Sequence, residues 1–259
     1  MAAAMLNPHL RYPVALFDLG STLIYFSGDW PEVSRQGQET LVHTLLQAGL
    51  KLDQAAFGTQ LQNRLNEYFA GRDADLVEHT TGATLLTLLA EWGYPDPPQA
   101  LVQHALRVMY QVSEVYWHVE AESQLALETL HQQGYRLGLI SNAADDANVQ
   151  RLVDKAGLRS YFDVILTSAA QGIRKPHPRI FQSALGYWQA APSQAIMVGD
   201  TLSADIQGAN DLGLFSVWVT RRAAPQDSPS DPIQPGATLE NVGELPGLLR
   251  SLLLNFTFR

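Results

Sequence analysis

Val14-Ala-Leu-Phe-Asp18 is a short apolar run that ends in a carboxylate and lies between Pro13 and Gly20. Such a run is typical of a strand that is buried on both faces. Similar runs recur downstream, each next to a stretch with helical periodicity: Arg136–Ser141, 162–166, Ala195–Gly199 and Phe215–Val219. Strands that alternate with helices predict an α/β fold with a doubly wound, mainly parallel sheet.

The region from about 30 to 116 lacks this alternation and shows four helical patterns in succession. They cover residues 31–47, 53–69, 78–92 and 98–116. We therefore expect an all-helical cap domain at residues 26–119, inserted into an α/β core domain of residues 1–25 and 120–259, with connections at 25–29 and 117–122. The core is also expected to contain helices at 145–156 and 203–213, a surface loop at 221–236 and a final helix at 242–254.

The composition of the chain favours some kinds of protein and disfavours others. Hydrophobic residues make up 46% of the 259 residues, which suits a packed globule. The net charge of −9 disfavours nucleic acid as a partner. No apolar run approaches the roughly 20 residues of a membrane span, and residues 1–12 lack a secretion signal, so we expect a cytoplasmic protein. The absence of cysteine excludes disulfides, thiolate zinc sites and a cysteine nucleophile.

Polar side chains follow three of the expected strands at their carboxyl ends. Asp18 ends the first strand, Ser141 and Asn142 end the second, and Asp200 follows a third. Lys175 lies in a nearby loop. Because ligands bind beyond the carboxyl ends of parallel strands, we expect these groups to meet in one crevice.

The expected set of side chains suits phosphoryl transfer. Two carboxylates can hold Mg²⁺, which prefers oxygen ligands and often also binds substrate phosphate. One carboxylate can attack phosphorus and form an acyl phosphate. Lys175 and Ser141 can then compensate the charge that develops on the phosphoryl oxygens. The pattern predicts an enzyme that acts on a small phosphorylated molecule.

Four motifs occur in the order of a known superfamily. They are Phe17-Asp-Leu-Gly-Ser-Thr-Leu23, Ile140-Ser-Asn142, Lys175-Pro-His-Pro-Arg-Ile-Phe181 and Val198-Gly-Asp-Thr-Leu-Ser-Ala-Asp205. Together they resemble the haloacid dehalogenase (HAD) superfamily over residues 14–254. The expected helical insertion is similar to the cap that this superfamily places after its first strand, and the core would be Rossmann-like.

The resemblance implies a Mg²⁺-dependent phosphate-ester hydrolase that works through an aspartyl-phosphate intermediate. Its nucleophile would be Asp18, whose charge Lys175 neutralises. The implied metal-binding residues are Asp18, the backbone carbonyl of Gly20, Asp200 and, behind them, Asp205. The implied substrate-binding residues are Ser141, Asn142 and Lys175.

The sequence departs from the superfamily pattern at one position. Phosphatases of this superfamily usually have a second aspartate two residues after the nucleophile, which protonates the leaving oxygen, and this chain has Gly20 there. A positioned acid–base group contributes on the order of 10²–10⁴-fold in rate. We expect slow turnover, or esters with good leaving groups such as acyl or anomeric phosphates. One hypothesis is that the substrate or a cap residue such as Asp29 or Glu78 supplies the proton.

Other functions remain open. A 2-haloacid dehalogenase works without metal and normally lacks the carboxylate represented here by Asp200. A catalytically weak module that binds phosphate and metal would also be consistent with Gly20. A phosphonate hydrolase would need a Schiff-base lysine in the cap, where Lys51 is the only lysine. Arg174 is interpreted as a solvated surface charge, and His177 as a structural or surface residue.

Overall fold

One parallel sheet of six strands forms the centre of the molecule. The structure is a computed structural model that describes residues 6–224 and 232–257. The strand order is β5-β4-β1-β6-β7-β8, and every neighbouring pair is parallel. The strands are β1 (Val14–Phe17), β4 (Arg136–Ser141), β5 (Val164–Thr167), β6 (Ala195–Gly199), β7 (Phe215–Val219) and β8 (Ala237–Leu239). The predicted α/β fold is confirmed, with β8 as an additional edge strand.

Helices cover both faces of this sheet. Along β1, Ala15 and Phe17 pack on one face while Val14 and Leu16 pack on the other, as the period of two in a strand requires. The first face is covered by α5 (Ser123–Gln132), α6 (Asp146–Lys155) and α10 (Leu245–Thr257). The second is covered by α8 (Pro178–Gly186) and α9 (Gln207–Leu212). The result is a three-layer core.

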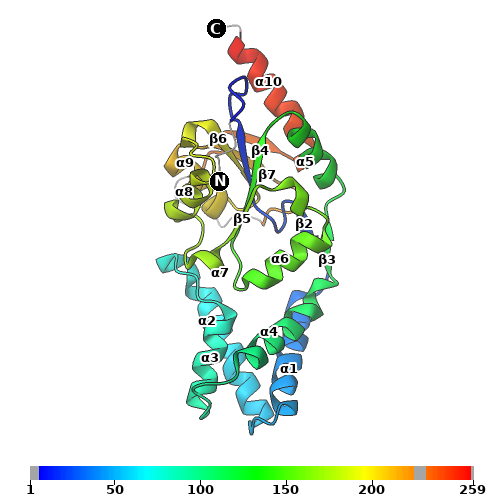
Figure 1. The fold of residues 1–259 in the computed structure, drawn as a ribbon, viewed down its shortest axis with the longest axis vertical. Coiled ribbons are helices and arrows are strands. Elements are labelled where there is room, and N and C mark those ends of the chain that lie inside the picture. The colour runs from blue at the N-terminus through cyan, green and yellow to red at the C-terminus, as the bar shows by residue number, and fades with distance from the viewer. Residues whose placement is uncertain (1–5, 225–231, 258–259) are drawn as a thin grey trace.

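Four further helices form a unit of their own beyond the carboxyl ends of the strands (Figure 1). They are α1 (Trp30–Gln47), α2 (Gln54–Asp75), α3 (Thr81–Glu91) and α4 (Gln99–Glu114). Their apolar faces share one buried cluster that includes Leu41, Phe57 and Leu88. We call α1–α4 the helical unit. Helix α2 passes through Gly71 and continues beyond the predicted end at 69, because the backbone turns only at Leu76, in a left-handed conformation.

Two short strands connect the helical unit with the core. β2 (Ile24–Phe26) and β3 (Trp117–Val119) pair in antiparallel fashion. The sequence predicts connections at 25–29 and 117–122 but no strands within them. Strands of three residues are too short for periodicity to predict, and here they pair residues about 90 positions apart.

A second contact joins the two parts at the end of α2. Val77 forms an isolated antiparallel bridge with Ile173. The Arg174 N–H donates to the Leu76 carbonyl at 3.0 Å, and the Glu78 N–H donates to the Gly172 carbonyl at 3.1 Å. The segment between α2 and α3 is therefore paired with the loop that precedes Lys175.

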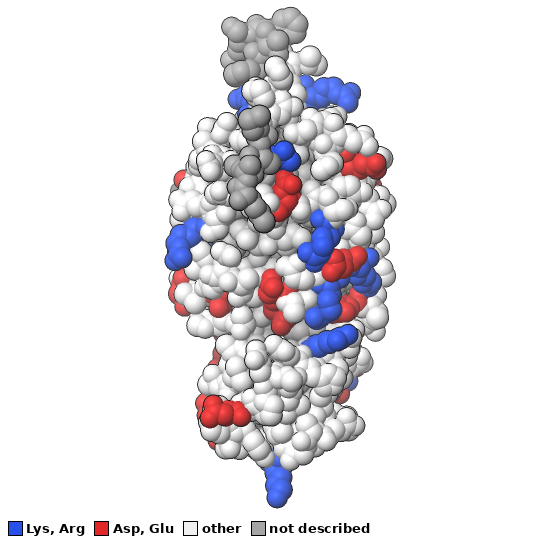
Figure 2. Space-filling model, in the orientation of Figure 1, with Lys and Arg blue, Asp and Glu red and all other residues white. Residues whose placement is uncertain are grey.

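The face of the molecule shown in Figure 2 gives no simple indication of a large partner. On the face shown in Figure 2, basic and acidic side chains are interspersed and form no extended basic area. In the described part of the chain, no helix has the length and apolar character required to cross a bilayer. The loop expected at 221–236 lies partly outside the described residues.

Candidate active site

The order of the sheet brings the predicted polar residues together. β1 lies between β4 and β6, so Asp18, Ser141 and Asp200 follow three adjacent strands at the same edge. The Asp18 N–H donates to the Val198 carbonyl at 2.9 Å, which extends the ladder of β1 and β6 by one step. Asp18 and Ser141 are both buried. Three independent strand ends thus fix the positions of these side chains.

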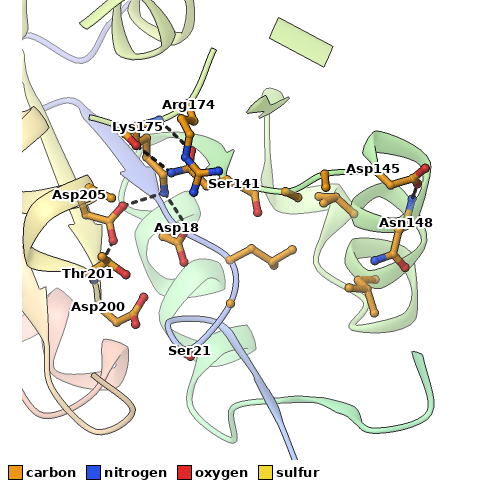
Figure 3. Close-up of a pocket in the computed structure, with 18 of the residues that line it drawn as sticks. Asp18, Ser21, Ser141, Asp145, Asn148, Arg174, Lys175, Asp200, Thr201 and Asp205 are labelled. Atoms are coloured by element: carbon orange, nitrogen blue, oxygen red, sulfur yellow. Dashed lines mark hydrogen bonds and ion pairs between the residues drawn. The ribbon is translucent and has the colours of Figure 1, made fainter. Parts of the chain in front are cut away.

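Lys175 is the cation of the site and is almost completely buried. Its Nζ donates to Asp18 Oδ1 at 2.6 Å and to the Ile140 carbonyl at 2.7 Å. It also forms an ion pair with Asp205 Oδ1 at 2.7 Å, as Figure 3 shows. Burial lowers the pKa of the ammonium, but the charges of Asp18 and Asp205 outweigh burial and raise this pKa above its usual value. Lys175 is therefore charged and fixed.

Asn142 holds the loop that carries Lys175. Its Nδ2 donates to the Lys175 carbonyl at 2.9 Å, and its Oδ1 accepts from the Lys175 N–H at 2.8 Å. Both ends of the amide are occupied by the backbone of one residue. Asn142 lines the pocket as the sequence predicts, but its geometry suits positioning of Lys175 better than direct contact with a ligand.

Asp205 and Asp200 form the acidic side of the site. Asp205 is 1% exposed, and its Oδ2 accepts from the Thr201 N–H at 3.0 Å. A Cβ at Gly199 would lie 2.2 Å from this same oxygen, so the carboxylate occupies the space of a side chain there. Two hydrogen bonds position Asp200. Its backbone carbonyl accepts from Trp218 Nε1 at 2.8 Å, and its Oδ1 accepts from Thr22 Oγ1 at 3.4 Å.

The three carboxylates lie close enough to share a cation. One oxygen from each of Asp18, Asp200 and Asp205 falls within 4.8 Å of the others. Burial, together with the charges of Asp18 and Asp205, raises the pKa of Asp200 to about 8. Burial likewise raises the pKa of Asp18 to about 6, against the lowering effect of the Lys175 charge. The single positive charge of Lys175 cannot neutralise the negative charges of three carboxylates.

A divalent ion fits this arrangement. The donors are all oxygens, as hard cations such as Mg²⁺ prefer. Asp205 Oδ1 is buried and, although it lies beside Lys175 Nζ, it has no partner in hydrogen-bond geometry. A cation between the carboxylates would remove their mutual repulsion and restore their ordinary acidity.

The loop after Asp18 is tight and places Gly20 at the cavity wall. The Ser21 N–H donates to the Ile24 carbonyl at 2.7 Å, and Ser21 has a left-handed φ of 60°. A Cβ at Gly20 would lie 3.5 Å from the Trp117 ring, an ordinary van der Waals distance. A side chain therefore fits at position 20.

A cavity of about 580 Å³ lies above these groups. All seven site residues predicted from the sequence line it: Asp18, Gly20, Ser141, Asn142, Lys175, Asp200 and Asp205. The helical unit contributes the opposite wall through Trp30, Phe69, Arg72, Leu76, Tyr110 and Ser113. The two proposed proton donors, Asp29 and Glu78, are not among the lining residues. Asp29 instead caps α1 by accepting from the Glu32 N–H.

The interpretation of Arg174 as a solvated residue is wrong. Arg174 is 4% exposed, and its Nη1 lies 3.2 Å from Glu78 Oε2. The same carboxylate accepts from Ser168 Oγ at 2.6 Å and from the Tyr68 hydroxyl. Glu78 and Tyr68 belong to the inserted region, whereas Arg174 and Ser168 belong to the core. The sequence offered no signal for this pair, because its members are 96 positions apart.

Comparisons with known proteins identify the family of the chain. The chain matches the haloacid dehalogenase-like hydrolase family over residues 12–213. A phosphoserine phosphatase of Thermus thermophilus is 38% identical over 111 residues, which are 43% of this chain and only 44% of that protein. A glyceraldehyde 3-phosphate phosphatase of Methanopyrus kandleri is 26% identical over 92% of this chain and 97% of that protein.

The fold is also similar to solved structures. The crystal structure of a 2-haloacid dehalogenase from Pseudomonas syringae pv. Tomato is 27% identical, with a TM-score of 0.66 over 92% of this chain and 98% of that one. The family match covers well over half of the chain. Together with the parallel sheet and the ordered motifs, this match shows that the chain belongs to the family of haloacid dehalogenase-like hydrolases.

Proposed function

We propose that the protein is a Mg²⁺-dependent phosphate-ester hydrolase that acts on a small phosphorylated metabolite through an aspartyl-phosphate intermediate on Asp18. The observation that carries this proposal is the meeting of Asp18, Asp200 and Asp205 with buried Lys175 at one sheet edge. The two phosphatase relatives support the same class of reaction, since one is named for phosphoserine and the other for glyceraldehyde 3-phosphate.

In the first step, the Asp18 carboxylate attacks the phosphorus of the ester. A P–O bond to Asp18 forms, the P–O bond to the leaving group breaks, and the leaving oxygen takes up a proton from solvent. Water next attacks the phosphorus of the acyl phosphate and gives up a proton to solvent, which releases inorganic phosphate and restores the carboxylate. Lys175 holds Asp18 Oδ1 at 2.6 Å and fixes the orientation of the nucleophile.

Mg²⁺ would be held by Asp18, Asp200 and the backbone carbonyl of Gly20, with Asp205 supporting the site from behind. When bound, the ion supplies positive charge opposite the phosphoryl oxygens. Lys175 adds a second positive charge, and the Ser141 hydroxyl at the end of β4 can donate to a phosphoryl oxygen. Asn142 contributes by holding the Lys175 backbone.

The helical unit would serve as the cap domain, residues 26–119, over a core of residues 1–25 and 120–259. Its side chains form the wall of the cavity that faces Asp18. This placement suits exclusion of water and selection of the substrate. A cytoplasmic location and the lack of a nucleic-acid partner stay predictions from composition.

A 2-haloacid dehalogenase is the second candidate, because the similar Pseudomonas syringae structure carries that name. In that reaction the aspartate attacks carbon and displaces halide without metal. Asp200 argues against a metal-free reaction. It adds a third carboxylate to the site, and a bound cation would relieve the repulsion among the three carboxylates.

A screen of phosphorylated metabolites with and without Mg²⁺ tests the proposal, with Asp18→Asn as the blank and Asp211→Asn, an exposed aspartate on α9, as the matched control. We expect phosphate release that needs Mg²⁺ and is lost only in Asp18→Asn. Chloride release from a 2-haloacid without Mg²⁺ would overturn the proposal in favour of the dehalogenase. Binding of phosphate and Mg²⁺ without any turnover would identify a binding module.

A further inference from the structure

We propose that Arg72 binds a second anionic group of the substrate, so that the preferred esters carry a carboxylate or another phosphate besides the phosphate that is removed. This inference rests on the proposed function, because it assigns a role to the wall that the helical unit contributes to the cavity of Asp18 and Lys175. It names the chemical class of substrate that the cavity selects.

Arg72 lies in the last turn of α2 and lines the cavity. Its guanidinium stacks over the Phe69 ring, with 5.2 Å between Cζ and the ring centroid. Phe69 lines the same cavity. The aromatic ring limits the directions that the guanidinium can take, so its donors are held in place before a ligand arrives.

The donors of Arg72 are not all used within the protein. Its Nε is buried and has no hydrogen-bond acceptor. Within the described ranges, no carboxylate lies within ion-pair distance of this arginine. A buried donor without an acceptor is unfavourable, and an anion in the cavity would satisfy it.

Simple structural roles account for only part of this arrangement. A cation in the last turn of a helix interacts favourably with the helix dipole, but an exposed side chain would do so equally well. The other arginine of the cavity, Arg174, is paired with Glu78. Asp145, the cavity carboxylate outside the metal cluster, caps α6 by accepting from the Asn148 N–H at 2.7 Å. Arg72 is thus the cation of the helical unit that faces the ligand space.

The shape of a guanidinium defines what it binds. Nε and one Nη form a planar pair of donors that matches the two oxygens of a carboxylate or of a phosphate. A neutral hydroxyl cannot engage both donors with the same strength. The substrate class that fits is therefore an ester with a phosphate at one end, next to Asp18, and a second anion at the other.

Binding of inert phosphonates tests this inference without turnover. ω-Phosphonocarboxylates with two to five methylenes are compared with alkylphosphonates of the same length, in which a methyl group replaces the carboxylate. Alkane bisphosphonates of the same lengths distinguish a second phosphate from a carboxylate. Dissociation constants are measured by calorimetry in Mg²⁺ for the native protein, Arg72→Gln and Arg64→Gln. Arg64 is the matched control, since it lies on the same helix and pairs with Glu91 outside the cavity.

We expect at least one anionic series to bind about 10- to 100-fold more tightly than its neutral counterpart at its best length, the range of a charge-assisted hydrogen bond. Arg72→Gln should lose this gain and keep its affinity for alkylphosphonates, while Arg64→Gln should retain both. A native protein that gains nothing from the second anion at any length would overturn the inference, as would a gain that survives in Arg72→Gln. If no phosphonate binds at all, the proposed function fails together with the inference.

Discussion

Replacing Glu78 with glutamine is expected to destabilise the junction between the helical unit and the core. The side chains of Glu78 and Arg174 are 1% and 5% exposed, so both charges are shielded from water. Glu78 also accepts from Ser168 Oγ and the Tyr68 hydroxyl. Glutamine has the same shape but no charge, so it removes the ion pair between Glu78 and the buried Arg174 guanidinium.

The magnitude follows from burial. Breaking a buried ion pair by removing one partner costs about 3–5 kcal/mol, because the remaining charge stays desolvated. At roughly 2–4 °C per kcal/mol for a chain of this size, the melting temperature should fall by about 6–20 °C. Urea denaturation followed by circular dichroism gives the free energy of unfolding, and a thermal scan gives the melting temperature.

Glu91→Gln provides the matched control. Glu91 pairs with Arg64, but their side chains are 50% and 33% exposed, so its loss should cost no more than about 1 kcal/mol. The double variant of Glu78→Gln with Arg174→Met should recover part of the lost stability, since the buried guanidinium is then replaced by an apolar side chain. If Glu78→Gln is as stable as Glu91→Gln, the junction is not a dry ion pair and the reasoning is refuted.

Four other outcomes are expected at the site. Gly199→Ala would place a Cβ 2.2 Å from Asp205 Oδ2, so Mg²⁺-dependent turnover should fall at least about tenfold in steady-state kinetics. Asn142→Ala removes two hydrogen bonds to the Lys175 backbone, and kcat should fall about 10- to 100-fold with little change in KM. Saturating Mg²⁺ at 100 times its Kd should stabilise the protein by about 2.7 kcal/mol in thermal scans, and EDTA should reverse this. Gly20→Asp should raise turnover of alkyl phosphates more than that of para-nitrophenyl phosphate; equal factors would contradict the leaving-group argument.

Much of the core follows from the sequence because a buried parallel strand leaves a clear signal. Runs such as 14–18 are continuous in apolar residues and end in a polar group, and their topology places those ends at one edge. The residues predicted from strand ends, Asp18, Ser141, Asn142 and Asp200, line one cavity, because each position depends mainly on its own strand and the residue after it. Lys175, expected in a nearby loop, and Gly20 and Asp205, which only the resemblance to the superfamily implied, line the same cavity.

The junction between the two parts was not predictable in the same way. Glu78 and Arg174 form an ion pair although they are 96 positions apart in the sequence, and neither lies in an element with a distinctive pattern. The pairing of β2 with β3 depends likewise on distant residues. Arg72 belongs to the part of α2 beyond the predicted helix at 53–69. Long-range contacts rather than local preference determine these features.

Gly20 has no side chain that could protonate the leaving oxygen, and this affects which esters can react. Asp29 caps a helix at the surface, and Glu78 is held by three donors away from the cavity, so neither is placed to protonate a leaving oxygen. Trp117 lies next to position 20, but its indole ring has no carboxyl proton to donate. An ester whose leaving oxygen is already stable as an anion needs no such donor. We therefore expect acyl or anomeric phosphates to be hydrolysed faster than simple alkyl esters.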